Sequence, residues 1–286
     1  MFNYGIYLLQ WQTAAAGDDM AKIEMNGNIA TNGRGKLKTT VHDIHMTLQG
    51  KGGVGKSFVA SLMAQYLTHK GAKPRCFDTD PVNHTLSKFK AFNVTSIELL
   101  KENSIDPLKF EELVVLLLEE DGPFVVDNGA STFIEMWNYI VRHGIREMLR
   151  ENGRRLFIHT VLQAGQAQDD CLNGFKQVAE TAEPGSIIVW ENRILGPIQY
   201  QGKTFQDMKV YQNNAATVLG AIQLPMNEYF ISNDLKTLTT ESLTLDEGQK
   251  SSLFNIVAKN RLRIYQREIF QQMDSVWEVI PEAVNA

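Results

Sequence analysis

The sequence predicts an α/β fold in which a doubly wound, mostly parallel sheet is flanked by helices on both faces. Strand-like and helix-like segments alternate from Val41 onward, an order that is typical of parallel βαβ units. Two of the expected strands contain the runs Phe124–Val126 and Ile187–Trp190, which are apolar on both faces. Central strands covered by helices on both sides require that pattern.

Each expected element follows from periodicity and from its flanking residues. The first helix, for example, has apolar residues at helical spacing from Phe58 to Leu67, and Gly71 ends the run. The strand before this helix is expected at 43–49, from the run Ile44–Leu48. The further strands are expected at 74–79, 123–127, 155–162, 186–191 and 218–224, and the helices at 57–70, 107–120, 133–150, 167–182 and 250–279.

The chain is expected to divide into a flexible N-terminal extension, residues 1–38, and one domain with a C-terminal helix, residues 39–286. Asn26–Asn28 and Asn32–Gly35 are rich in turn-forming residues, which favours a tether. The apolar run Tyr4–Trp11 has no Lys or Arg before it, which argues against a secretion signal. A short membrane-touching segment is the alternative for this region.

Composition argues against two broad classes of function. The chain is 43% hydrophobic and 21% charged with a formal net charge of −5, so no global positive field indicates nucleic-acid binding. No run of 18 apolar residues predicts a membrane-spanning helix. Cys76 and Cys171 lack metal-ligand spacing and are expected to be reduced, buried thiols. We therefore expect a cytoplasmic protein, with a peripheral position at the inner membrane or DNA association as alternatives.

A phosphate-binding loop follows the first expected strand. Gly50–Ser57 fits the pattern G-x-x-x-x-G-K-[ST], whose glycines let successive backbone N–H groups surround phosphate oxygens. Lys56 is expected to contact the β- and γ-phosphates and Ser57 to ligate Mg²⁺. The predicted nucleotide-binding residues are Gly50, Lys51, Gly52, Gly53, Val54, Gly55, Lys56, Ser57 and Phe58.

The same glycines also fit the dinucleotide pattern G-x-G-x-x-G, which must be weighed against a triphosphate site. Lys56 and Ser57 have no role in holding a dinucleotide, whereas a triphosphate with Mg²⁺ needs both. The second strand ends in two acids, Asp78 and Asp80, and the strand 123–127 ends in Asp127 like a Mg²⁺-supporting Walker B element. These features favour a nucleoside triphosphate and Mg²⁺.

Lys51–Ser57 resembles the deviant Walker A motif of the ParA/MinD class of P-loop ATPases. The resemblance implies ATP as the nucleotide, an ATP-dependent homodimer, and a Lys51 that contacts the partner subunit's phosphates. It further implies that Asp80 positions the attacking water and that Asp78 supports the Mg²⁺ shell with Ser57 and Asp127. The catalytic residues would then be Asp80, Lys51 and Lys56. Asn192 ends the strand at which relatives place residues that contact the base, and a turn asparagine is the alternative.

A narrower resemblance reaches beyond these loops. Thr47–Gly50, Asp78–Asn83, Asp127–Ser131, Gly165–Ala167, Gly196–Ile198 and Gly202–Phe205 are similar to the TraL family of nucleotide-binding proteins of conjugative transfer operons. This implies a role in plasmid transfer or type IV secretion, with components of that apparatus as partners. A non-hydrolysing assembly scaffold and a plasmid-partition-type ATPase are the alternatives. A reductase like the nitrogenase iron protein is disfavoured, because neither cysteine suits a bridging cluster.

The expected C-terminal helix has a broad apolar stripe from Leu253 to Trp277, with Lys259, Arg261, Arg263 and Arg267 between its apolar residues. Packing on the sheet with a solvated basic edge is the favoured interpretation. Membrane binding by a basic amphipathic helix is the alternative.

Overall fold

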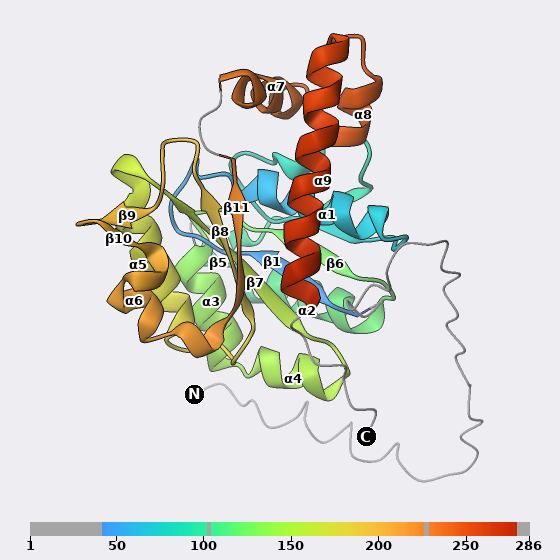
Figure 1. The fold of residues 1–286 in the computed structure, drawn as a ribbon. Helices are drawn as coiled ribbons and strands as arrows, with labels where there is room; N and C mark the ends of the chain where they lie inside the picture. The colour runs from blue at the N-terminus through green and yellow to red at the C-terminus, as the bar shows by residue number, and fades with distance from the viewer. Residues whose placement is uncertain (1–41, 102–103, 226–228, 279–286) are drawn as a thin grey trace, which may run out of the picture. The chain divides into compact units, whose positions relative to one another are not determined.

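A computed structural model describes residues 42–101, 104–225 and 229–278. Its main feature is a seven-stranded sheet with the order β11-β8-β7-β1-β6-β2-β3, in which every neighbouring pair is parallel. β1, the first strand in the sequence, lies in the middle of the order, so the chain winds outward in both directions (Figure 1). The predicted doubly wound α/β class is therefore confirmed.

The sheet strands are β1 (Ile44–Thr47), β2 (Arg75–Asp78), β3 (Val94–Ser96), β6 (Phe124–Asp127), β7 (Leu156–Gln163), β8 (Ile187–Asn192) and β11 (Val218–Leu224). The helices are α1 (Lys56–His69), α2 (Pro107–Glu119), α3 (Phe133–Arg142), α4 (Ile145–Glu151), α5 (Gln168–Ala179), α6 (Lys209–Gln212), α7 (Tyr229–Thr240), α8 (Leu245–Lys250) and α9 (Ile256–Glu278). Two short hairpins join β4 (Leu100–Lys101) to β5 (Ser104–Ile105) and β9 (Gln199–Tyr200) to β10 (Lys203–Thr204).

Helices cover both faces of the sheet. Helices α1 and α9 lie together on one face, where the Tyr66 hydroxyl donates to Asp274 at 2.7 Å and its ring contacts Phe270. On the other face α2 meets α3 through Phe110 and Tyr139, whose ring centroids are 4.3 Å apart. The central strands β1, β6 and β7 are buried along most of their length, and β6 is accordingly apolar without alternation from Phe124 to Val126.

The register of the sheet places three polar side chains side by side. Thr47 of β1 is opposite Asp127 of β6, and Asp127 is in turn opposite Asp78 of β2. All three residues end their strands. Because the strands are parallel, these carboxyl ends meet at one edge of the sheet, which is where ligands bind in folds of this type.

Three expectations about the elements are corrected. The helix expected at 133–150 is two helices, because Gly144 adopts a φ of 63° and turns the chain between α3 and α4. The C-terminal helix begins at Ile256 rather than at 250, since the Asn255 side chain accepts the N–H groups of Val257 and Ala258 as a cap. Edge strand β3 and helices α7 and α8 were not expected from periodicity.

Three further expectations concern the cysteines, membrane-spanning helices and the N-terminal extension. Cys76 and Cys171 are free and buried, as predicted. No helix in the described ranges has the length and hydropathy needed to cross a membrane. The flexible extension predicted for 1–38 lies outside the described residues.

Two buried histidines cross-link the centre of the sheet. The indole N–H of Trp190 donates to His159 Nδ1 at 2.9 Å, and His159 Nε2 lies 3.1 Å from His45 Nδ1. Because His159 Nδ1 accepts a hydrogen bond, the proton of His159 lies on Nε2 and is donated to His45 Nδ1. Each ring then carries a single proton and is neutral. His45 stands edge-on to Trp277 of α9 with centroids 5.2 Å apart. The histidines are core residues as predicted, although His45 Nε2 has no hydrogen-bond partner.

Burial lowers the pKa of His159 to about 3 and, with His159 and Arg155 nearby, lowers the pKa of His45 well below its ordinary value. A folded-state pKa below the unfolded value of about 6.5 means that acid favours unfolding. We predict that each histidine costs on the order of 1–2 kcal/mol of unfolding free energy between about pH 7 and about pH 5. Urea unfolding followed by tryptophan fluorescence measures this loss.

His45→Phe keeps an aromatic ring and removes one titration, so it should lose less stability over this pH range than the wild type. His143→Phe, at an exposed position, is the matched control and should keep the wild-type dependence. Equal pH dependence in His45→Phe and wild type would contradict the assignment.

Candidate nucleotide-binding site

The predicted phosphate loop joins β1 to α1 at the carboxyl edge of the sheet. Gly53 and Gly55 have φ values of 76° and 105°, which side chains with a Cβ rarely adopt. A Cβ on Gly50 would lie 2.9 Å from the Phe133 ring at the start of α3. These glycines are therefore required by the backbone path, and the loop is pressed against the helix that follows β6.

The loop is fixed at its start by Gln49, for which no role at the site was predicted. The buried Gln49 amide donates to the carbonyls of Val161 on β7 and Cys171 on α5, both at 3.1 Å. A Cβ on Gly174 would lie 2.1 Å from Gln49 Oε1. Gln49 therefore needs a glycine in α5 beside it, a pairing distant in the sequence that no local pattern could indicate.

The Lys56 ammonium folds back over this loop. It donates to the carbonyl oxygen of Lys51 at 3.1 Å, and its side chain is almost fully buried. Burial lowers the pKa of Lys56, while the carboxylates of Asp127 and Asp80 act in the opposite direction. The structure thus brings the predicted phosphate lysine to the two acids predicted beside it.

Asp127 is a buried carboxylate with one unused oxygen. The Thr47 hydroxyl donates to its Oδ1 at 2.8 Å, but the buried Oδ2 has no hydrogen-bond partner. Burial raises the pKa of Asp127 to about 7, although the side chains of Ser57 and Thr47 act to lower it. A buried oxygen without a partner, beside the Ser57 hydroxyl, is a donor set that suits Mg²⁺.

The carboxylate oxygens of Asp78 and Asp80 accept hydrogen bonds that hold the loop after β2. Asp78 accepts from the Asp80 N–H at 3.1 Å and from the N–H and hydroxyl of Ser87, both at 2.9 Å. Asp80 accepts from the Val82 N–H and from Asn83. With both oxygens of Asp78 already bonded, its predicted role at Mg²⁺ stays a prediction. Its observed contacts hold the loop that carries Asp80.

Asp80 also lies against the segment after Asp127. A Cβ on Gly129 would be 3.0 Å from Asp80 Oδ1 and 3.1 Å from its Cα. Burial acts to raise the pKa of Asp80, but hydrogen bonds from Val82 and Asn83, and the charge of Lys56, outweigh it and lower the pKa. Asp80 is therefore an ionised group held between two loops, and Gly129 is a requirement of this contact.

Lys51 forms an ion pair inside its own chain. Its ammonium lies 2.8 Å from the Asp170 carboxylate at the start of α5, and both side chains are substantially exposed. The hydrogen bond and charge of Asp170 raise the pKa of Lys51. The structure therefore places Lys51 at the rim of the loop, whereas Lys56 is inside it.

Asn192 bonds to the phosphate loop itself. Its amide donates to the Val54 carbonyl at 2.9 Å, and its oxygen accepts from the Ile194 N–H at 3.2 Å. The predicted contact with a base remains a prediction. The next residue, Arg193, lines a cavity of about 210 Å³ between the ends of β8 and β11 and helix α9. Its other lining residues are Gln223, Leu224, Pro225, Tyr265, Glu268, Ile269 and Gln272.

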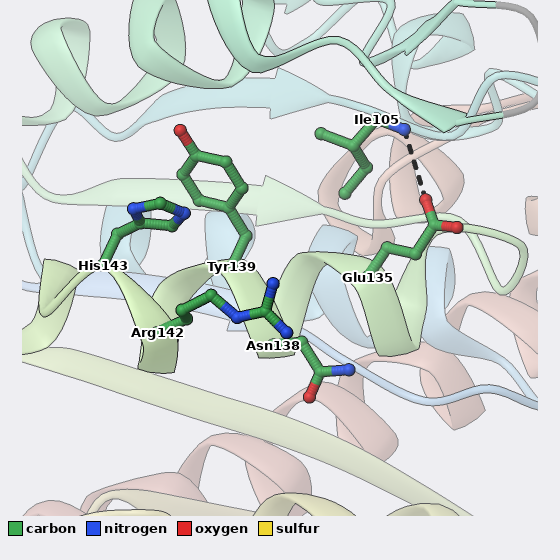
Figure 2. A pocket seen from close by; sticks show the side chains of 6 residues that line it. All are labelled: Ile105, Glu135, Asn138, Tyr139, Arg142 and His143. Carbon is green, nitrogen blue, oxygen red and sulfur yellow. Dashed lines mark hydrogen bonds between the residues drawn. The ribbon is translucent and has the colours of Figure 1, made fainter. Parts of the chain in front are cut away.

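A larger cavity of about 300 Å³ lies elsewhere, between α3 and β5 (Figure 2). The Glu135 carboxylate there accepts the Ile105 N–H at 3.2 Å, and the rings of Tyr139 and His143 are 4.2 Å apart. None of its lining residues is a predicted nucleotide-binding residue. We place the site at the loop instead, because the glycine-dependent backbone and the unpartnered carboxylate oxygen are there.

The parallel sheet and the glycine-dependent loop between β1 and α1 are the arrangement of a P-loop fold. The family described as "ParA: NUBPL iron-transfer P-loop NTPase" matches residues 40–129. Two proteins named TraL from Escherichia coli are 40% and 37% identical to this chain over 234 residues. Each alignment covers 81% of this chain and 97% of the relative. The chain therefore belongs to the TraL family.

Solved structures of similar fold include a plasmid partition protein from Borrelia burgdorferi B31 bound to AMPPNP, with a TM-score of 0.45 and 15% identity over 81% of this chain and 99% of that one. The MinD cell division protein of Aquifex aeolicus has a TM-score of 0.41 and 14% identity, over 84% of this chain and 99% of that one.

The buried charge of Asp127 gives a prediction for the protein without nucleotide or Mg²⁺. An acid whose folded pKa is raised loses stability as the pH rises from its unfolded to its folded pKa. Asp127→Asn has no such loss. Its gain in unfolding free energy over the wild type should be larger at about pH 8 than at about pH 5, by on the order of 1–3 kcal/mol.

Chemical denaturation at the two pH values measures this difference. Glu119→Gln, at an exposed position on α2, serves as the control and should show the same stability change at both. An Asp127→Asn gain that does not depend on pH would contradict a buried, proton-binding carboxylate.

Proposed function

We propose that this protein binds and hydrolyses Mg·ATP and acts as a dimerising molecular switch in conjugative plasmid transfer. The observation that carries the proposal is the juxtaposition of a glycine-dependent loop, the buried Lys56 and the unpartnered Asp127 oxygen at one sheet edge. The role in transfer rests on membership of the TraL family and on the resemblance to proteins of transfer operons.

The chain's own groups suit the binding of a triphosphate. Backbone N–H groups of the loop and the N-terminus of α1 favour an anion, and phosphate oxygens would replace the Lys51 carbonyl as the acceptor for Lys56. Ser57 and Asp127 would hold Mg²⁺, which neutralises phosphate charge when bound. Binding would also offset the unfavourable burial of two charged groups, the Lys56 ammonium and the Asp127 carboxylate.

Asp80 and Lys51 supply the proposed switch. Asp80 is ionised and held at the junction of the loops that follow β2 and β6, which suits it to orient water. Lys51 contacts Asp170 through an exposed ion pair, a type of interaction that is weak and readily exchanged. We propose that Lys51 leaves Asp170 for the triphosphate of a second subunit when the protein dimerises.

Lys56→Ala should abolish measurable ATP binding, because the loop loses its buried positive charge. Isothermal titration calorimetry with ATP and Mg²⁺ measures this. Lys73→Ala replaces an exposed lysine before β2 and should bind like the wild type. Unchanged affinity in Lys56→Ala would rule out Lys56 as the nucleotide lysine.

The dimer is tested in a variant that retains ATP. Asp80→Ala should slow hydrolysis and accumulate a dimer with ATP and Mg²⁺, since it leaves the phosphate contacts intact. Adding Lys51→Ala should weaken that dimer, because a contact made only in the dimer is lost. Light scattering with and without nucleotide gives the mass of each species.

Asp170→Asn in the Asp80→Ala background is the matched control, because it breaks the same ion pair while leaving Lys51 in place. This variant should dimerise at least as well as Asp80→Ala alone. A monomer in every condition, or a dimer indifferent to nucleotide and to Lys51, would contradict the switch. Single-turnover hydrolysis by the wild type separates the switch from a scaffold, which would bind ATP without cleaving it.

A further inference from the structure

Large apolar side chains are exposed together at the end of the molecule formed by α7 and the start of α9. Tyr229 and Phe230 begin α7 and are 73% and 64% exposed, and Ile256, the first residue of α9, is 84% exposed. Leu253 and Val257 are each 59% exposed. Figure 1 shows α7, α8 and the first turns of α9 side by side, past the carboxyl end of β11. We call these five residues the apolar tip.

Ring and charge contacts join the two parts of the apolar tip. The rings of Tyr229 and Phe230 are 5.4 Å apart, and the Arg261 guanidinium stacks 5.2 Å from the Phe230 ring. Arg261 also pairs with Asp234 of α7 at 2.7 Å. Val257 lies one turn before Arg261 on the same side of α9. Arg261 thus joins the aromatic pair of α7 to the first turns of α9.

Basic residues are frequent in the segment that carries part of this surface. Residues 248–267 contain five cations, Lys250, Lys259, Arg261, Arg263 and Arg267, and no acidic residue, in a chain whose formal net charge is −5. Acids lie nearby as well: Asp234 pairs with Arg261, Glu247 accepts from the Thr244 hydroxyl, Asp246 accepts from the Gln266 amide, and Glu268 lines the cavity beside Arg193. The segment 248–267 therefore carries four cations besides Arg261, whose charge Asp234 offsets.

We propose that the apolar tip inserts into the interface of an anionic lipid membrane. Exposed aliphatic and aromatic side chains with adjacent cations match the two components of such a surface, an apolar boundary beneath negative headgroups. Duplex DNA would use the cations, but a phosphate backbone offers Ile256, Leu253 and Val257 no apolar partner. The proposal concerns a surface separate from the phosphate loop and does not depend on nucleotide binding.

Co-sedimentation of the full chain with phosphatidylglycerol-containing vesicles tests the proposal, with phosphatidylcholine vesicles as the neutral comparison. Binding to the anionic vesicles should fall roughly fivefold or more in Ile256→Ser, which removes one inserted side chain. The double variant Arg263→Gln and Arg267→Gln should lose roughly fivefold per cation. Leu108→Ser is the matched control, since Leu108 is 74% exposed on α2, and it should bind like the wild type.

Several outcomes would overturn the proposal. These are absence of binding to anionic vesicles, equal loss in Leu108→Ser and Ile256→Ser, or equal binding to neutral vesicles. Binding to duplex DNA that depends on Arg263 and Arg267 but not on Ile256, without vesicle binding, would assign the surface to nucleic acid. Affinity for ATP, measured in parallel, should be unchanged in every variant, so a failure here is distinct from a failure of the nucleotide proposal.

Discussion

The alignment of three parallel strand ends around Asp127 is the constraint on which the site depends. The register places Thr47 and Asp78 on either side of Asp127, so a carboxylate is buried where the sheet meets the loop. Burial alone is unfavourable for this group, as its raised pKa shows. Thr47 satisfies one oxygen and leaves the other without a partner. A sheet selected only for stability would not retain such an arrangement, which is why we interpret it as a binding site.

Around this constraint, glycines and one glutamine set the distances between the loops. Gly129 permits Asp80 to approach the segment after Asp127, and Gly50 permits the phosphate loop to contact Phe133 at the start of α3. Gln49 ties the start of the phosphate loop to α5, the helix that also carries Asp170. The phosphate loop therefore touches α3 through the Phe133 ring and α5 through the Gln49 side chain, and these two contacts are the ones that would carry a change of loop position to either helix.

The fold class and the phosphate loop could be predicted from the sequence, because each depends on patterns within short contiguous segments. The phosphate loop is one contiguous segment, and the strands 123–127 and 186–191 are continuous apolar runs, so order and fold class followed from them. Gly144 broke the helix expected at 133–150 by adopting a positive φ, although a single glycine in a helical pattern does not require this. The contacts Gln49–Gly174 and Lys51–Asp170 join residues more than a hundred positions apart. Only the folded chain shows them.

Helix α9 joins the apolar tip to the cavity beside Arg193. Its first turns carry part of the apolar tip, while Tyr265, Glu268 and Gln272 further along line the cavity next to Arg193. Gln272 exchanges two hydrogen bonds with the backbone of Gln223 in β11, and Trp277 contacts the buried histidine pair. The helix is thus fixed to the sheet along its second half and projects beyond it at its start. A ligand that filled the cavity would contact the same rigid helix that presents Ile256. Any shift of α9 on binding would therefore move the apolar tip as well, since a continuous helix transmits displacement along its axis.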